Sequence, residues 1–315
     1  MRLAVSGSLA YDRILNFRGS FADHIIAEKV HQLSISFFTP TLAESYGGTA
    51  GNIAYSLSLL GAKPSILARA GNDFSPYRTH LEESGVDTKS IAIDDALRTA
   101  FATIITDEKD NQITAFYPGA MESKYENPLP QEGEVSLAVV SAGNMDDMQS
   151  FPEHFRKNNI PFIFDPAQQI PSLPKDTLIN GIRDSRALIS NDYELALIMK
   201  KTGLTEADIL AETTMIVTTL GEKGSRITTA EGVFEVPSAS PHSIEDPTGA
   251  GDAYRAGFMF GLLKEWPLAT VGKFASVVAC YTIEKRGTQT HTFTLDEVQS
   301  RYQENFKEEL PSAGN

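Results

Sequence analysis

Short apolar runs alternate with helical patterns through the middle of the chain. Each run has three or four consecutive apolar residues, and one more stands near the amino terminus: Leu3–Val5, Leu137–Val140, Phe162–Phe164, Ala187–Ile189 and Met215–Val217. Helical spacing of apolar positions separates several of them, for example around Asp147–Lys157 and Tyr193–Lys201. Buried strands that alternate with helices predict an α/β fold with a central, mostly parallel sheet flanked by helices.

A second group of strand-like segments lies earlier in the chain. Leu33–Phe38 alternates polar and apolar residues, and Thr99–Thr106 and Gln112–Tyr117 look like two strands joined by the polar loop 107–111. We expect these segments to form a small β-sheet lid from about residues 13–48 and 97–118. The lid would be inserted in the large α/β domain, so that residues 1–315 form a single unit.

The last third of the chain predicts one hairpin and three helices. An antiparallel pair is expected at Ile227–Val236, where Glu231-Gly232 supplies the turn. The helices that follow are expected at Ala250–Lys264, Pro267–Lys285 and Leu295–Leu310.

The composition is that of a globular protein and argues against some kinds of binding partner. The 315 residues are 41% hydrophobic and 22% charged, and the formal net charge is −14. An acidic surface argues against binding a nucleic-acid backbone. No apolar stretch reaches membrane-span length, and the lone Cys280 lies in an apolar run typical of a buried small side chain. We therefore expect a cytoplasmic protein with neither a nucleic-acid nor a membrane partner.

The segment Asp246–Phe258 carries the strongest chemical signal. Its sequence Asp-Pro-Thr-Gly-Ala-Gly-Asp begins a helix at about Ala250, and the small residues Gly249, Ala250 and Gly251 leave the first backbone N–H groups bare. Such a helix start binds anions and suits the charge of a transferring phosphoryl group. Asp252 in the first turn can act as a base toward a hydroxyl placed there. The alternative is a plain helix start with Asp252 as a capping residue.

A second glycine-rich segment, Gly47–Ala54, also begins a helix. Together the two segments resemble the two signature patterns of the PfkB, or ribokinase-like, kinase family. The first pattern is matched at Gly47, Gly48, Asn52, Ala54, Gly61 and Gly71. The resemblance implies a ribokinase-like fold and an ATP-dependent kinase, with Asp252 as catalytic base beside the N–H groups of Gly249, Ala250 and Gly251.

Two further segments match the family on the nucleotide side. Asn191-Asp192-Tyr193-Glu194 looks like its Asn-x-x-Glu motif, in which Asn191 contacts the nucleotide and Glu194 holds Mg²⁺ indirectly, through water. Thr219–Gly224 resembles the loop where Thr219, Gly221 and Gly224 face the ATP phosphates. Without the resemblance, Asn191 is typical of a helix N-cap and the glycines of a hairpin turn.

The resemblance also assigns a substrate side. Ser8, Asp12, Gly48 and Asn52 match positions that hold sugar hydroxyls, although an aspartate after a strand is often a turn residue. Across nearly the whole chain the sequence looks like adenosine kinases of the actinobacterial type. That likeness puts Ser36, Phe101 and Phe116 around a purine on the lid and Gln169 at the substrate. Ile170 departs from it, since those kinases carry an arginine after the two glutamines.

These features predict transfer of the ATP γ-phosphate to the 5′-hydroxyl of a ribonucleoside, with adenosine preferred and AMP as product. Mg²⁺ is the expected cofactor, and K⁺ near Asp246 is an option that the family offers. A homodimer joined through the lid is also expected. The alternatives are a sugar kinase of the same superfamily and a non-catalytic nucleoside-binding protein. The chain has no Gly-x-x-x-x-Gly-Lys-Ser/Thr loop and no His-Glu-x-x-His motif.

Overall fold

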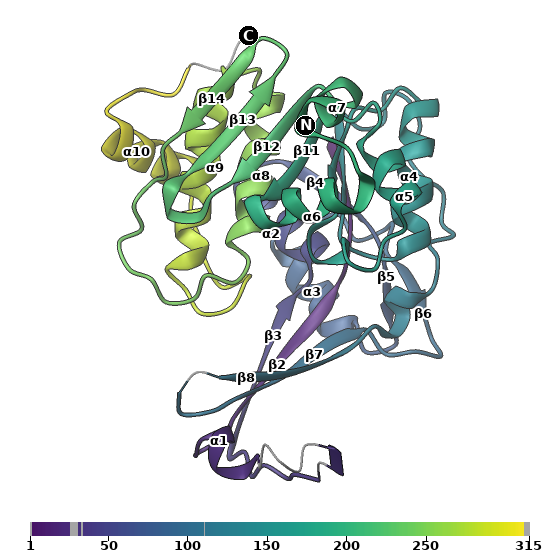
Figure 1. The fold of residues 1–315 in the computed structure, drawn as a ribbon, viewed down its shortest axis with the longest axis vertical. Coiled ribbons are helices and arrows are strands. Elements are labelled where there is room, and N and C mark those ends of the chain that lie inside the picture. Colours follow the sequence, from purple (N-terminus) through teal and green to yellow (C-terminus); the bar gives the residue numbers. More distant parts are fainter. Residues whose placement is uncertain (1, 26–30, 33, 110, 312–315) are drawn as a thin grey trace.

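The larger part of the molecule is an eight-stranded sheet between two layers of helices (Figure 1). The computed structural model describes residues 2–25, 31–32, 34–109 and 111–311. Across the sheet the strands are β14 (Gly232–Val236), β13 (Ser225–Thr229), β12 (Met215–Thr219), β11 (Ala187–Asn191), β10 (Phe162–Asp165), β9 (Leu137–Ser141), β1 (Arg2–Ser6) and β4 (Lys63–Leu67). All neighbours from β12 to β4 are parallel, and β13 and β14 add an antiparallel edge. This confirms the predicted mostly parallel sheet.

The two helix layers bury opposite faces of this sheet. In β1, Leu3 and Val5 belong to one hydrophobic cluster and Ala4 to the other, because successive side chains of a strand point to opposite faces. The first layer contains α2 (Thr49–Leu59), α3 (Ser75–Glu83), α8 (Ala250–Leu263), α9 (Leu268–Ile283) and α10 (Leu295–Phe306). The second contains α4 (Met145–Lys157), α5 (Lys175–Ile182), α6 (Asp192–Thr202) and α7 (Glu206–Glu212).

The predicted helices and the buried cysteine agree with the structure in most details. Helix α10 ends four residues earlier than predicted, because Lys307 adopts a left-handed conformation at its C-cap. Cys280 is buried in α9. Among the described residues, no helix combines the length and apolarity needed to cross a bilayer.

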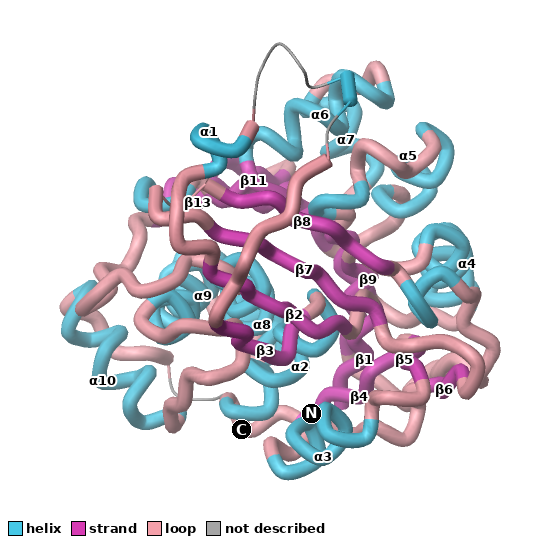
Figure 2. The backbone as a smooth tube through the Cα atoms, turned by 90° about the horizontal axis from the view of Figure 1, so that it is seen from below, coloured by secondary structure: helices cyan, strands magenta, loops and turns pink. Residues whose placement is uncertain are grey.

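A small separate sheet projects from the large domain, and Figure 2 shows its four strands side by side. The strands are, in order, β3 (Thr41–Gly47), β2 (Ala10–Asn16), β7 (Ala100–Thr106) and β8 (Gln112–Tyr117). Strands β7 and β8 confirm the predicted pair. The sequence interpretation missed β2, which places Asp12 within a strand rather than in a turn. The remaining short elements are α1 (Phe21–His24), β5 (Arg69–Gly71), β6 (Ala92–Asp94) and three 3₁₀ turns at Gly119–Glu122, Ala167–Gln169 and Gly221–Lys223.

The predicted strand Leu33–Phe38 is wrong. Leu33 lies outside the described residues, and residues 34–38 have no strand partner. Their exposure alternates as the sequence suggested, but Phe37 packs against the rings of Phe17 and Phe21 instead of pairing with the sheet. The strand forms later, where Thr41 pairs with Asn16. Alternation identifies extended chain, whereas a strand also needs a neighbouring backbone to bond.

Candidate active site

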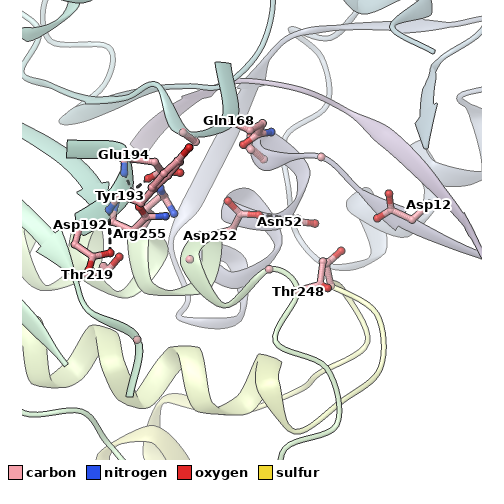
Figure 3. Close-up of a pocket in the computed structure, with 18 residues that line it drawn as sticks. Asp12, Asn52, Gln168, Asp192, Tyr193, Glu194, Thr219, Thr248, Asp252 and Arg255 are labelled. Carbon is pink, nitrogen blue, oxygen red and sulfur yellow. Dashed lines mark hydrogen bonds between the residues drawn. The ribbon is translucent and has the colours of Figure 1, made fainter. Parts of the chain in front are cut away.

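A cleft of about 630 Å³ lies where the strands of the large sheet end and the small sheet begins (Figure 3). Asn191 and Thr219 line it as the last residues of β11 and β12, at the edge where open parallel sheets usually bind ligands. Residues from both glycine-rich segments join them. Of the residues singled out in the sequence, those that line the cleft are Asp12, Gly48, Asn52, Asn191, Glu194, Thr219, Gly221, Gly249, Gly251 and Asp252.

The start of α8 has the geometry that the sequence predicted for an anion site, except at Ala250. Gly249 adopts a left-handed conformation (φ 80°), and a side chain there would meet the Thr288 methyl group at 2.9 Å. The N–H groups of Gly251 and Asp252 have no hydrogen-bond partner within the described residues. The Ala250 N–H donates to the Pro247 carbonyl (3.2 Å), so it is not available as predicted. The turn that starts the helix uses this donor itself.

Asp252 faces the cleft in the first turn of this helix. Its Oδ2 accepts a hydrogen bond from Asn52 Nδ2 (2.8 Å). Burial raises the pKa of the Asp252 carboxyl to about 6, an effect that the nearby Arg255 charge and the Asn52 hydrogen bond partly oppose. A carboxylate of this pKa is a better proton acceptor than an exposed aspartate and is still ionised at neutral pH.

Asn52 is held by a buried network that sequence interpretation missed. Gln289 Nε2 donates to Asn52 Oδ1 (2.9 Å) and also to the Tyr77 hydroxyl. The Tyr77 hydroxyl in turn donates to the Gly47 carbonyl (2.8 Å), at the end of β3. The network thus links the residue that bonds Asp252 to the junction between the small sheet and α2. Because its members lie far apart in the sequence, no local motif indicates it.

Asp12 of β2, which the resemblance assigns to the substrate, lines the cleft. Burial, followed by the charge of Asp246, raises the pKa of Asp12 to about 6. A side chain at Gly47 would lie against the Asp12 carboxylate and require it to shift. Ser8 does not line the cleft as expected: its Oγ accepts a hydrogen bond from the Thr49 N–H (3.0 Å) and caps the start of α2.

The residues that the resemblance assigns to the nucleotide have structural roles in part. Asn191 and Glu194 form a capping box for α6, with Glu194 N–H donating to Asn191 Oδ1 (2.7 Å) and Asn191 N–H to Glu194 Oε2 (2.8 Å). Both residues also line the cleft, so their N-cap role does not exclude the role that the resemblance implies. Gly221 also lines the cleft, whereas Gly224 does not. Gly224 (φ 92°) packs so closely on the Val236 carbonyl that a side chain would overlap it.

The aromatic residues do not form the expected pair. Phe101 lies opposite Tyr117, and Phe116 lies opposite Ala102. Directly paired residues share a face and successive ones alternate, so Phe101 and Phe116 lie on opposite faces of the small sheet. Phe116 is on the face of Asp12, which pairs with Ala102, and Phe101 packs beneath the Arg13 guanidinium at 4.3 Å. Within one chain the two rings cannot both contact the same base.

Two further predicted substrate residues lie away from the cleft. Ser36 is exposed in the segment that forms no strand. Gln169 Nε2 donates to the Gly143 carbonyl (2.8 Å), and the neighbouring Gln168 lines the cleft in its place. The 3₁₀ turn at Ala167–Gln169 produces this exchange, because it directs adjacent side chains differently. Ile170, where an arginine was expected by resemblance, is a buried core residue.

Comparison with known proteins agrees with this architecture. Residues 19–294 match the profile of the pfkB family carbohydrate kinases. The nucleoside kinase of Methanothermobacter thermautotrophicus is 34% identical over 276 residues, which is 84% of this chain and 87% of that protein.

Solved structures are similar over the whole chain. Burkholderia thailandensis nucleoside kinase in complex with inosine has a TM-score of 0.85 at 32% identity, covering 98% of this chain and 100% of its own. The same protein in complex with ADP-inosine has a TM-score of 0.82 at 33% identity, covering 98% of this chain and 97% of its own. Methanocaldococcus jannaschii nucleoside kinase, an archaeal member of the ribokinase family, has a TM-score of 0.86 at 27% identity and covers 96% of this chain and 98% of its own. They confirm the ribokinase-like fold. With a family profile that matches most of its length, the chain belongs to the pfkB family of carbohydrate kinases.

Proposed function

We propose that this protein transfers the γ-phosphoryl group of ATP to the 5′-hydroxyl of a ribonucleoside, with adenosine preferred. The observation that carries the proposal is Asp252 beside the unpaired N–H groups at the start of α8, in a cleft that also contains Asp12. The high similarity to nucleoside kinases supports the substrate class. ATP and the nucleoside are thus the small-molecule partners, and we expect the protein to act in the cytoplasm, where both occur.

In the reaction, the 5′-oxygen forms a bond to the γ-phosphorus as its proton passes to the Asp252 carboxylate. The bond from the γ-phosphorus to the bridging oxygen breaks, and its electron pair leaves with ADP. The N–H groups of Gly251 and Asp252 donate to the phosphoryl oxygens, which gain charge during transfer. Asp12, Gly48 and Asn52 hold the ribose hydroxyls so that the 5′-oxygen lies near Asp252.

The acidic groups of the cleft fit a magnesium ion that is held mainly by phosphates and water. No cluster of three or more metal-ligating side chains occurs among the described residues, and Glu194 already uses one carboxylate oxygen in its capping box. Mg²⁺ usually binds one or two carboxylates together with substrate phosphates, so Glu194 and Asp192 suit it directly or through water. When bound, the ion supplies positive charge to the phosphate oxygens.

A monovalent cation such as K⁺ remains part of the proposal at the Asp246 loop. Asp246 Oδ1 accepts from the Thr248 N–H (2.9 Å) and Oδ2 from the Gly287 N–H (3.2 Å). The carboxylate thereby ties the turn before α8 to the loop after α9. A cation bound beside these loops would stabilise the same turn, and K⁺ dependence of turnover would reveal it.

A turnover assay with ATP and Mg²⁺ on a panel of adenosine, inosine, guanosine, ribose and fructose tests the proposal. We expect the nucleosides to be phosphorylated, adenosine most efficiently, and the sugars far more slowly. Efficient ribose or fructose phosphorylation without nucleoside turnover would identify the sugar kinase instead. Nucleoside binding without any turnover would identify the non-catalytic binding protein.

We also infer a homodimer joined through the small sheet, which would serve as the lid of the cleft. Large apolar side chains on this sheet remain exposed in the single chain, among them Leu42 (63%) and Ile113 (41%). A sheet that leaves one apolar face uncovered gains stability by burying it against a partner.

A further inference from the structure

Arg255 stands out among the side chains of the cleft because of its charge. Within the described residues, the cleft is lined by four carboxylates and by one basic side chain, which is Arg255. The carboxylates are Asp12, Asp192, Glu194 and Asp252. The nucleotide substrate carries several negative charges, so the acidic side chains alone would repel it. The single positive charge of Arg255 therefore makes the space beside it the most favourable place in the cleft for a negatively charged phosphoryl group.

The guanidinium is held rigidly by groups beneath the cleft. Arg255 Nη2 donates to Asp165 Oδ1 (2.6 Å), and Nε lies 2.5 Å from Asp165 Oδ2. The Ser141 hydroxyl donates to the same carboxylate (2.6 Å). Asp165 and Ser141 are completely buried at the ends of β10 and β9. This support fixes the plane of the guanidinium and leaves Nη1 without a hydrogen-bond partner in the described structure.

The free Nη1 lies at the anion site. A Cβ built on Gly251 would be only 2.6 Å from it, so Nη1 lies against the bare first turn of α8. Figure 3 shows Arg255 close to Glu194 and Tyr193, with the proposed base Asp252 on the side toward Asn52. Arg255 is also one helical turn from Asp252 on the same helix. A group that moves from the nucleotide toward Asp252 would pass beside this nitrogen.

The geometry points to Arg255 as a further catalytic residue, whose Nη1 donates a hydrogen bond to the phosphoryl group during transfer. The inference rests on the phosphoryl transfer proposed above. Arg255 forms and breaks no covalent bond: the proton still goes to Asp252 and the leaving electron pair to ADP. Its contribution is a fixed positive charge where negative charge spreads over the phosphoryl oxygens.

A purely structural role for Arg255 makes a different prediction. If its only task were to neutralise Asp165, then removing both charges would restore the enzyme. The test therefore compares Arg255→Met with the double variant Arg255→Met/Asp165→Asn, in which no buried carboxylate is left unpaired. Arg183→Met, which removes an exposed arginine paired with Glu212, is the matched control.

We expect kcat of the double variant to fall by roughly 10²–10³-fold, as when one donor to a developing anion is lost, with nucleoside KM within about threefold. Arg183→Met should keep wild-type kcat. A second readout is the melting temperature with ADP, Mg²⁺, nucleoside and aluminium fluoride, which mimics the transferring phosphoryl group. The double variant should keep the shift produced by ADP and lose the extra shift produced by aluminium fluoride.

The outcomes separate this inference from the proposed function. A double variant with wild-type kcat and the full aluminium fluoride shift would reduce Arg255 to the counter-ion of Asp165. A wild-type protein without nucleoside turnover would instead reject the proposed function. Should Arg255→Met alone fail to fold, the double variant still decides the question.

Discussion

At the scale of single residues, the chemistry of Asp252 depends on its surroundings more than on its identity. It lies in the first turn of α8, beside two N–H groups that have no partner in the described part of the chain, and it is bonded by Asn52. Another carboxylate of the cleft, Glu194, is bonded to the backbone N–H of its own helix start and is less available as a base. In the proposed reaction, the position of Asp252 therefore favours it over Glu194 as the proton acceptor.

Replacing Asp252 with asparagine should lower kcat by about 10²–10⁴-fold and leave nucleoside affinity little changed, because the amide keeps the shape and loses the proton acceptor. Steady-state kinetics with ATP and adenosine, together with calorimetric binding of adenosine, would measure both quantities. A variant that keeps more than half of the wild-type kcat would remove Asp252 from the mechanism.

The sequence pointed to those residues of the cleft that stand in a local motif. Asp252, Asn52 and Glu194 stand in short patterns that match the family, and the structure brings them into one cleft. Gln289 could not be found in this way, because it meets Asn52 only through folding across 237 positions of sequence. Arg255 stands three residues after Asp252, but the role proposed for it depends on Asp165 in strand β10.

At the scale of elements, the hydrogen-bond network from Gly47 to Asp252 couples the small sheet to the start of α8. It begins at the end of β3 and passes through Tyr77 of α3 and Gln289 to Asn52 of α2. Gln289 is buried, so a lost bond there cannot be replaced by bulk water. The orientation of the Asn52 amide, and with it the hydrogen bond to Asp252, thus depends on this glutamine.

Gln289→Met should raise the pKa of Asp252 above its value of about 6, because the Asn52 hydrogen bond that lowers this pKa is weakened. A protonated Asp252 cannot accept the proton, so kcat of the wild type falls as the pH drops through about 6. In the variant this acid limb should move to higher pH by roughly half to one unit, the equivalent of one hydrogen bond of about 1 kcal/mol.

The measurement is kcat against pH at saturating substrates, because Asp12 also titrates near 6 and would affect kcat/KM. Gln299→Met on the exposed surface of α10 is the matched control and should leave the limb in place. An acid limb that stays at the wild-type pH in Gln289→Met would show that the network does not act on Asp252.

The small sheet shows that a strand pattern in the sequence does not predict the register between strands. Alternation in the sequence located β7 and β8, but the side of the sheet on which Phe101 and Phe116 lie depends on their register. One residue of offset moves a side chain to the other face. The same limit explains the misplaced strand at Leu33–Phe38, since pairing with β2 begins only at Thr41.

At the scale of the whole molecule, one apolar row crosses the outer face of the small sheet. Leu15 pairs with Leu42 on one side and with Ile105 on the other, and Ile105 pairs with Ile113, so one side chain from each strand joins the row. The row lies on the face of Phe101, opposite the face of Asp12. A continuous apolar row of this kind suits contact with the same row of a second copy, as in a two-fold dimer.

The double variant Leu42→Glu/Ile113→Glu should therefore separate a dimer into monomers, because it places two charges in the middle of this contact. Light scattering at micromolar concentration should give the wild type a mass near twice 34.3 kDa and the variant a mass near 34.3 kDa. Val233→Glu, at an exposed apolar position of β14 in the large sheet, is the matched control and should remain a dimer.

The strands of the row also carry Asp12 and Phe116, whereas the proposed nucleotide side belongs to the large sheet. Loss of the partner should thus weaken adenosine binding by roughly tenfold, or about 1.4 kcal/mol, and ATP binding much less. A wild-type protein that stays a monomer at micromolar concentration would contradict the dimer. A Leu42→Glu/Ile113→Glu monomer that binds adenosine as tightly as the wild type would contradict the link between the dimer and the substrate.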